Sequence, residues 1–167
     1  VFKLTHRNSK ITISTDIENA DIHALKIIEK CYRILDNLIE LNNDWLKSFD
    51  PIRSGSQDPL ILNMENAAFE ANVGPMAAVA GAIADLITED LMLKGAKHIV
   101  VENGGDIAIK ANQNVQISLF SETSFLGNKY SLSIPPNDEY LGIASSSGTY
   151  GHAISLGNAD IVTIIAK

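Results

Sequence analysis

The chain has 167 residues, 46% of them hydrophobic, and a formal net charge of −7. This length and composition predict one globular domain spanning residues 1–167. The acidic balance argues against a protein that tracks nucleic-acid phosphates or docks on an anionic membrane, because both roles need a basic face.

The first third of the chain predicts a β-hairpin followed by a long helix. Phe2 to Thr5 and Ile11 to Ser14 alternate apolar and polar residues, as half-buried strands do. Apolar residues then recur every three or four positions from roughly Asp21 to Ser48, which favours an amphipathic helix lying across a sheet. Asp50-Pro51 ends this pattern, because proline disfavours helix in the residue before it.

Two further helices and a β-rich segment follow. Leu60 to Ala71 predicts a short helix, and Gly74-Pro75 begins another that runs to about Lys94. Strands are expected at His98 to Glu102, Ile107 to Lys110, Val115 to Phe120, Tyr130 to Ile134, Leu141 to Ser145 and Ile161 to Ala166. The fold class is therefore predicted to be α+β, with helices packed on a largely antiparallel sheet. Because the last strand reaches Lys167, we expect further chain beyond it, so the domain is expected to lack its C-terminal segment.

The compartment is predicted from two features. Cys31 is the single cysteine, so no intramolecular disulfide forms, and its apolar surroundings favour a buried thiol over a reactive one. The longest apolar stretch, Val73 to Ala84, is far shorter than the roughly 20 residues that a membrane-spanning helix needs. With no signal peptide in view, these features predict a cytoplasmic protein.

Residues 73–85, VGPMAAVAGAIAD, are the first of three glycine-bearing segments. The start of a helix offers unpaired N–H groups that attract anions, and the small residues allow close approach of a ligand or another backbone. Composition alone favours tight packing here. Asp85 is open to three interpretations: a solvated turn residue, a cap, or an acid that faces a ligand.

Residues 101–107, VENGGDI, are the second segment. Asn-Gly is a strong hairpin signal, and two successive glycines also allow a flat ligand to lie against the backbone. The hairpin explains Asn103, Gly104 and Gly105. It does not require the acids at positions 102 and 106.

Residues 145–152, SSSGTYGH, are the third segment. They do not match the G-x-S-x-G nucleophile elbow, and no orienting acid lies nearby, which argues against Ser147 and His152 as a nucleophile and its base. Hydroxyl groups and main-chain N–H groups of this kind line phosphate sites, although the same residues also form plain loops. From the residues alone, both alternatives remain.

Taken in this order, the three segments resemble the ApbE-like superfamily, whose members include flavin transferases once linked to thiamine biosynthesis. The family's Lys-Gly-x-x-x-Asp motif falls on Ala80, Gly81 and Asp85, with alanine in place of lysine. Its Gly-Gly-Asp turn falls on residues 104–106, and its Ser-x-Ser-Gly and histidine fall on residues 145–148 and 152. Ser155 stands where the transferases carry an aspartate.

This resemblance implies an ApbE-like fold with a site for FAD, FMN or another nucleotide or phosphorylated ligand. The expected contact residues are Gly74, Pro75, Met76, Asn103, Gly104, Gly105, Asp106, Ser145, Ser146, Ser147, Gly148, Thr149 and His152. His152 is the catalytic candidate, as a phosphate contact or proton carrier. The family's Asp-Ala-x-Ala-Thr motif supplies Mg²⁺ ligands and is expected after Lys167, where this sequence ends. Within this sequence, Asp85 and Asp106 are the motif acids that could bind a metal.

Three functions therefore compete. The first is an FMN-transferase-like enzyme. The second is a binding protein without turnover, since Ala80 and Ser155 replace the family's lysine and aspartate. The third is a structural homo-oligomer whose subunits meet through the alanine-rich helix or the long amphipathic helix.

Overall fold

The computed structural model describes residues 1–119, 129–148 and 157–166. Its helices and strands follow the chain in this order: β1 (Phe2–His6), β2 (Ser9–Thr15), α1 (Ala20–Leu41), α2 (Asn43–Lys47), α3 (Pro59–Ala71), the 3₁₀ helix η1 (Pro75–Ala78), α4 (Val79–Leu93), β3 (His98–Asn103), β4 (Asp106–Ala111), β5 (Val115–Ser118), β6 (Ser131–Ile134), β7 (Leu141–Ser146) and β8 (Val162–Ala166).

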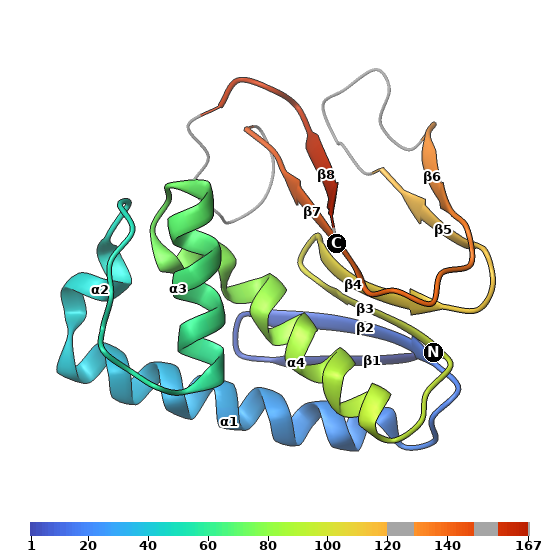
Figure 1. The fold of residues 1–167 in the computed structure, drawn as a ribbon, viewed down its shortest axis with the longest axis horizontal. Helices are drawn as coiled ribbons and strands as arrows, with labels where there is room; N and C mark the ends of the chain where they lie inside the picture. The colour runs from blue at the N-terminus through green and yellow to red at the C-terminus, as the bar shows by residue number, and fades with distance from the viewer. Residues whose placement is uncertain (120–128, 149–156, 167) are drawn as a thin grey trace.

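The sheet is antiparallel throughout. Six strands pair in the order β1-β2-β3-β4-β7-β8, and β5 and β6 form a separate two-stranded sheet (Figure 1). Helices α1 and α4 pack against this larger sheet, α1 on β1 and β2 and α4 on β3 and β4. The predicted α+β class, with helices on a largely antiparallel sheet, is confirmed.

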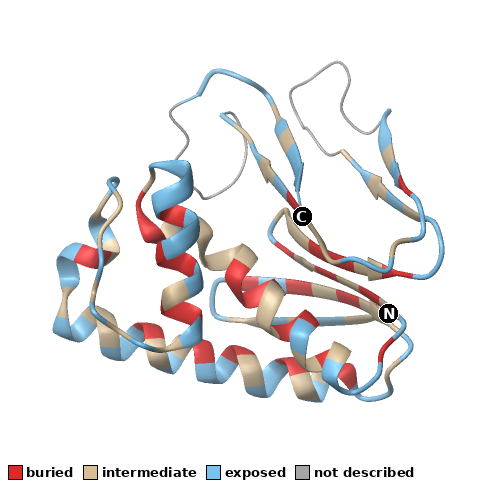
Figure 2. Cartoon of the chain, viewed as in Figure 1, coloured by how far each residue is buried: buried red, intermediate tan, exposed pale blue. Residues whose placement is uncertain are grey.

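Residue alternation along the strands divides the apolar side chains between two clusters. Ile99 and Val101 of β3 join the large core under the helices, whereas Val100 packs into a small cluster that includes residues of β5 and β6. In β4, Ala108 belongs to the large core and Ile109 to the small one. The buried residues of Figure 2 are accordingly concentrated where α1 and α4 meet the sheet and where α3 packs on α4.

The long predicted helix is shorter than expected and is interrupted. Helix α1 ends at Leu41, and Asn42 leaves helical geometry with φ −146° and ψ 83°. Its side chain then accepts a hydrogen bond from the N–H of Trp45 and caps α2. Asparagine offers the backbone this local alternative, which explains why the chain breaks here although the apolar spacing continues to the buried Trp45.

The predicted helix from Gly74 to Lys94 forms with one difference. Its first residues, Pro75 to Ala78, are a 3₁₀ turn, and the α-helix begins at Val79. Gly95 follows its last turn with φ +88°, the left-handed geometry that glycine adopts at helix ends. Helix α4 therefore projects its early turns toward the β3–β4 turn. Among the described residues, no helix is both long and apolar enough to cross a membrane.

Candidate functional site

The end of the β3–β4 hairpin is fixed to the first turn of α4 through one peptide group. Asn103 Nδ2 donates to the carbonyl oxygen of Ala80 at 3.0 Å, and the N–H of Gly81 lies near the Asp106 carboxylate and favours its charged form. These two groups belong to the same Ala80–Gly81 peptide, so the hairpin holds it from both sides. Asn103 is almost fully buried, which makes its hydrogen bond costly to lose.

The turn between these residues has the geometry that the sequence predicts. Asn103 pairs with Asp106, and the two residues between them, Gly104 and Gly105, have φ of +65° and +110°. Positive φ at both positions of a two-residue hairpin turn favours glycine over residues with a side chain. Gly104 is exposed and a Cβ there would meet no atom within 4 Å, so the turn presents bare backbone to solvent.

Strand β7 completes the junction at Ser145. Its N–H lies near the Asp106 carboxylate and favours the charged form of that group, and its hydroxyl lies 2.9 Å from the Thr163 hydroxyl of β8. The carbonyl of Ser145 faces Gly105, whose hypothetical Cβ would lie 3.6 Å from that oxygen. The Asp106 carboxylate thus lies near main-chain N–H groups of both α4 and β7, at the point where the helix meets these strands.

Asp85 and Asp106 are two carboxylates in a region that disfavours negative charge. Burial raises the pKa of Asp106, and the N–H groups of Gly81 and Ser145 oppose that rise. Burial, with the negative charges of Glu89 and Asp106, raises the pKa of Asp85 to about 6. Asp85 lies one helical turn after Gly81, so it is close enough to Asp106 for the two charges to repel each other.

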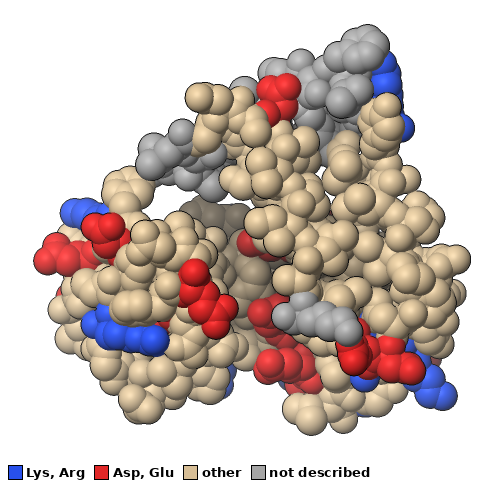
Figure 3. All heavy atoms as spheres, turned by 45° about the horizontal axis from the view of Figure 1, so that its top comes forward, with Lys and Arg blue, Asp and Glu red and all other residues tan. Residues whose placement is uncertain are grey.

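The molecular surface carries the same acidic character. On the face drawn in Figure 3, aspartate and glutamate side chains gather along a central hollow, and lysine and arginine lie toward the margins. Among the described residues, no group of three or more His, Cys, Asp and Glu is arranged to hold a metal ion. Asp85 and Asp106 as metal ligands therefore stay a prediction that rests on two acids.

Gly74, Pro75 and Met76 serve packing in the structure. Gly74 is buried, and a Cβ on it would overlap the carbonyl of Ser48, so the chain after α2 approaches too closely for any side chain. The 3₁₀ turn that follows packs on α2, α3 and α4. The structure thus supplies a packing reason for the first glycine segment, as its composition favours. Contact of these three residues with a ligand stays a prediction.

The serine-rich segment is described in part. Ser145 and Ser146 end β7, and Ser146 is exposed. Gly148 donates its N–H to the carbonyl of Ala159 at 2.9 Å, and a Cβ on it would overlap the carbonyl of Gly157. Ser147 adjoins the end of the strand, whereas Thr149 and His152 lie outside the described residues. Of the predicted contact residues, the structure therefore brings together Asn103 to Asp106 and Ser145.

The sequence interpretation missed one buried carboxylate, Glu65 of α3. It is 1% exposed and accepts hydrogen bonds from the indole N–H of Trp45 at 3.0 Å and from the N–H and hydroxyl of Ser54. Arg53 Nη1 lies 3.6 Å from its other oxygen. Its place beside Ile61, Met64 and Ala68 on the apolar side of α3 is the signal that marks it as buried. These partners give it a structural role in holding the loop before α3.

Curated relatives of the chain come from archaea. A "UPF0280 protein" of Methanospirillum hungatei is 44% identical over 120 residues, which are 72% of this chain and 49% of that protein. A UPF0280 protein of Methanobrevibacter smithii is 36% identical over 94% of this chain and 66% of that protein. One from Archaeoglobus fulgidus is 37% identical over 99% of this chain and 68% of that protein. The chain thus spans half to two thirds of the length of these relatives.

The assignment to the ApbE-like superfamily is wrong. The family model that matches residues 1–167 is described as "AbpE bacteria", and the relatives share the name UPF0280 protein, which states no activity. The description as a flavin transferase and a thiamine-related role rested on that assignment and are not supported, whereas binding of FAD or FMN and the ApbE-like form of the fold stay predictions. Short glycine and serine motifs misled the interpretation, because hairpin turns and helix packing produce the same residues. The chain belongs to the family described as AbpE bacteria.

Proposed function

We propose that this protein binds a phosphorylated small molecule together with a divalent cation, where α4, the β3–β4 turn and β7 meet. The observation that carries the proposal is the pair Asp85 and Asp106, whose pKa values are both raised. Carboxylates with raised pKa values are characteristic of functional sites, because burying a negative charge costs stability.

A divalent cation would neutralise the negative charge of this pair of carboxylates. Mg²⁺ prefers oxygen ligands and is commonly held by one or two carboxylates, with phosphate oxygens and water completing its shell. An ionised carboxylate has about four lone-pair positions. Beside the two neighbouring N–H groups, Asp106 therefore has further lone pairs with which to bind a cation. Asp85 and Asp106 supply a part of a cation's ligand shell, which fits a cation that arrives bound to its phosphate ligand.

The neighbouring backbone suits the phosphate side of such a ligand. The Gly104-Gly105 turn is free of side chains, and the exposed Ser146 follows Ser145 at the end of β7. Main-chain N–H groups at glycine turns and serine hydroxyls are recurrent phosphate contacts. The proposed function is binding alone and includes no chemical step. Self-association into a homo-oligomer stays a prediction.

The test is thermal and urea unfolding followed by the fluorescence of the single tryptophan, Trp45, which is buried. Four conditions are compared: Mg²⁺ alone, ADP with a chelator, ADP with Mg²⁺, and pyrophosphate with Mg²⁺. A ligand at about 100 times its Kd stabilises the folded state by roughly 2.7 kcal/mol. We expect that stabilisation only where cation and phosphate are both present.

Matched variants locate the effect. Asp85→Asn removes one of the two carboxylates without changing side-chain size and should abolish the synergy between cation and phosphate. Glu40→Gln removes an exposed charge near the end of α1 and should leave it intact. If ADP stabilises equally with and without Mg²⁺, or if Asp85→Asn responds like the wild type, the proposed site is wrong.

A further inference from the structure

A second hollow lies on the side of α4 that faces α1, apart from the carboxylate pair. It is a pocket of about 220 Å³ bounded by α1, the start of α3 and α4. Its apolar lining comes from Ile27 and Ile34 of α1 and from Leu86 of α4, together with Leu60 and Leu93. A cavity of about 150 Å³ is known to hold benzene, so this one has room for a short hydrocarbon chain.

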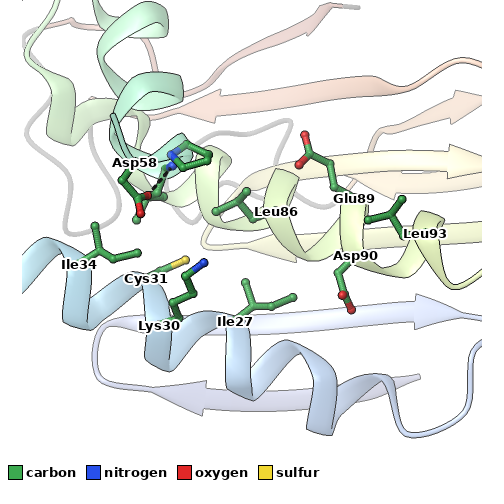
Figure 4. A pocket seen from close by; sticks show the side chains of 11 residues that line it. Ile27, Lys30, Cys31, Ile34, Asp58, Leu86, Glu89, Asp90 and Leu93 are labelled. Atoms are coloured by element: carbon green, nitrogen blue, oxygen red, sulfur yellow. Dashed lines mark hydrogen bonds between the residues drawn. The ribbon is translucent and has the colours of Figure 1, made fainter. Parts of the chain in front are cut away.

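The charges around this apolar lining are mostly negative. Asp58, Glu89 and Asp90 line the pocket, and Lys30 is the cation among its lining residues. Figure 4 shows the Asp90 carboxylate reaching from α4 toward α1, beside Ile27. One oxygen of Asp90 is 3.4 Å from the Lys94 ammonium, and the other, Oδ2, is buried with no hydrogen-bond partner among the described residues. A buried carboxylate oxygen without a donor is unfavourable unless a ligand supplies one.

Cys31 does not make this a covalent site. Its thiol points into the pocket in Figure 4, but burial raises its pKa to about 11, with the Asp58 charge as a second cause. The reactive form of cysteine is the thiolate, which is scarce at neutral pH under these conditions. The pocket therefore offers apolar surface, a neutral thiol and an acidic rim.

We propose that this pocket binds a small organic cation, an alkylammonium, with its chain between Ile27 and Leu86 and its ammonium among the carboxylates of the rim. Charge complementarity decides for a cation over a neutral or anionic molecule, because three acids and one lysine line the pocket, and Lys94, outside the lining, pairs with one oxygen of Asp90. An ammonium also supplies the hydrogen-bond donors that Asp90 Oδ2 lacks. The site is independent of the phosphorylated ligand and stands if that proposal fails.

The experiment compares three probes of one shape: hexylammonium, 1-hexanol and hexanoate. Each is titrated into protein with labelled isoleucine methyl groups, observed by NMR. Hexylammonium should shift the Ile27 and Ile34 methyl signals with a millimolar Kd, because so small a ligand has few atoms to contribute. The signal of Ile99, buried in the sheet, should stay unchanged.

Two conservative variants test the acidic rim. Asp58→Asn removes charge but keeps an oxygen to accept the hydrogen bond from the Leu60 N–H at the start of α3, and Asp90→Asn removes the charge of the carboxylate whose Oδ2 is buried. Each should weaken hexylammonium binding roughly two- to fivefold, the range of partly exposed charge pairs. Glu29→Gln, on α1 but outside the pocket lining, should leave the Kd unchanged.

The alternatives give different results. If 1-hexanol binds as tightly as hexylammonium, the pocket recognises only the chain and the cation proposal is overturned. Preference for hexanoate, or no methyl shift with any probe, overturns it as well. Equal weakening by Glu29→Gln shows attraction to the acidic surface in general and contradicts a site at the rim.

Discussion

The two faces of the six-stranded sheet bury very different amounts of apolar surface. Under the helices, twenty buried residues form one core, whereas four of the described residues form the cluster on the β5–β6 side. Strand β8, at the sheet edge, leaves large apolar side chains exposed, with Ile164 at 62% and Ile165 at 45%. Since burial of apolar surface is the main stabilising contribution, the helical side should determine the stability of the domain.

The largest expected effect comes from one substitution made on each side. Ile99→Ala in β3 removes a fully buried side chain and should lower the free energy of unfolding by about 4 kcal/mol. Ile165→Ala in β8 removes a side chain that is nearly half exposed and should cost about 1 kcal/mol or less. Urea unfolding followed by Trp45 fluorescence measures both. Similar losses would contradict the contrast between the two sides.

The second comparison is between two glycines of the first segment. Gly74→Ala places a methyl group on the Ser48 carbonyl and should destabilise the protein by about 3 kcal/mol, as overpacking does. Gly81→Ala places one 3.6 Å from Asp106 Oδ2, an ordinary contact, and should stabilise α4 by up to about 1 kcal/mol. Thermal unfolding of both variants checks that Gly74→Ala is the less stable of the two. A destabilised Gly81→Ala would mean that the contact between the Ala80–Gly81 peptide and the β3–β4 turn tolerates no added atom.

The carboxylate pair predicts a dependence of stability on pH. The folded-state pKa of Asp85, about 6, lies above its ordinary value of 3.8. Protonation is therefore favoured in the folded state, and the contribution of this group to stability is fully present below pH 3.8 and is lost as pH rises through 6. Asp85→Asn removes the penalty and should be more stable than the wild type at neutral pH, by on the order of 2 kcal/mol.

Urea unfolding across this pH range provides the check, with the difference between variant and wild type as the measured quantity. That difference cancels the contributions of groups that do not interact with Asp85, including Asp16, whose pKa is lowered because hydrogen bonds from the N–H groups of Lys97 and His98 outweigh its slight burial. The difference in the free energy of unfolding should approach zero as the pH falls toward 4. A difference that does not depend on pH would show that the Asp85 carboxyl is ordinary in the folded state.

The smallest effect is expected at the surface of α1. Arg7 donates to both oxygens of Asp36 at 2.7 and 2.8 Å, but both side chains are about half exposed. Asp36→Asn should therefore cost about 0.5 kcal/mol in low salt and nothing measurable at high ionic strength. A larger or salt-independent loss in thermal unfolding would show that this pair fixes α1 on the β1–β2 hairpin.

Much of the fold was predictable, because local signals and tertiary packing agree. Alternation predicted β1 and β2, and the Asn103-Gly104-Gly105 sequence predicted the turn with two positive φ angles. The end of α1 was not predicted. The apolar spacing continues from Leu41 to Trp45, and nothing in that spacing shows that Asn42 will use its side chain to start a new helix.

The site was predicted less well, since its chemistry depends on contacts between distant segments. The motif made Asp106 a candidate site residue, but its proximity to Gly81 and Ser145 joins parts of the chain that no local pattern connects. Gly74 fits a ligand site and a close packing contact equally well on sequence, and the Ser48 carbonyl supplies the packing reason. A glycine shows that there is no room for a side chain, but the sequence does not show whether backbone or a ligand takes that space.

Asp85 and Asp106 form one electrostatically coupled pair. A carboxyl-carbon NMR titration measures this coupling directly, in the wild type and in Asp106→Asn. The pair predicts that the Asp85 carboxyl titrates with a pKa of about 6 in the wild type and lower when the Asp106 charge is removed. A pKa near the ordinary 3.8 in the wild type, or one that Asp106→Asn leaves unchanged, would contradict the pair and with it the proposed cation site.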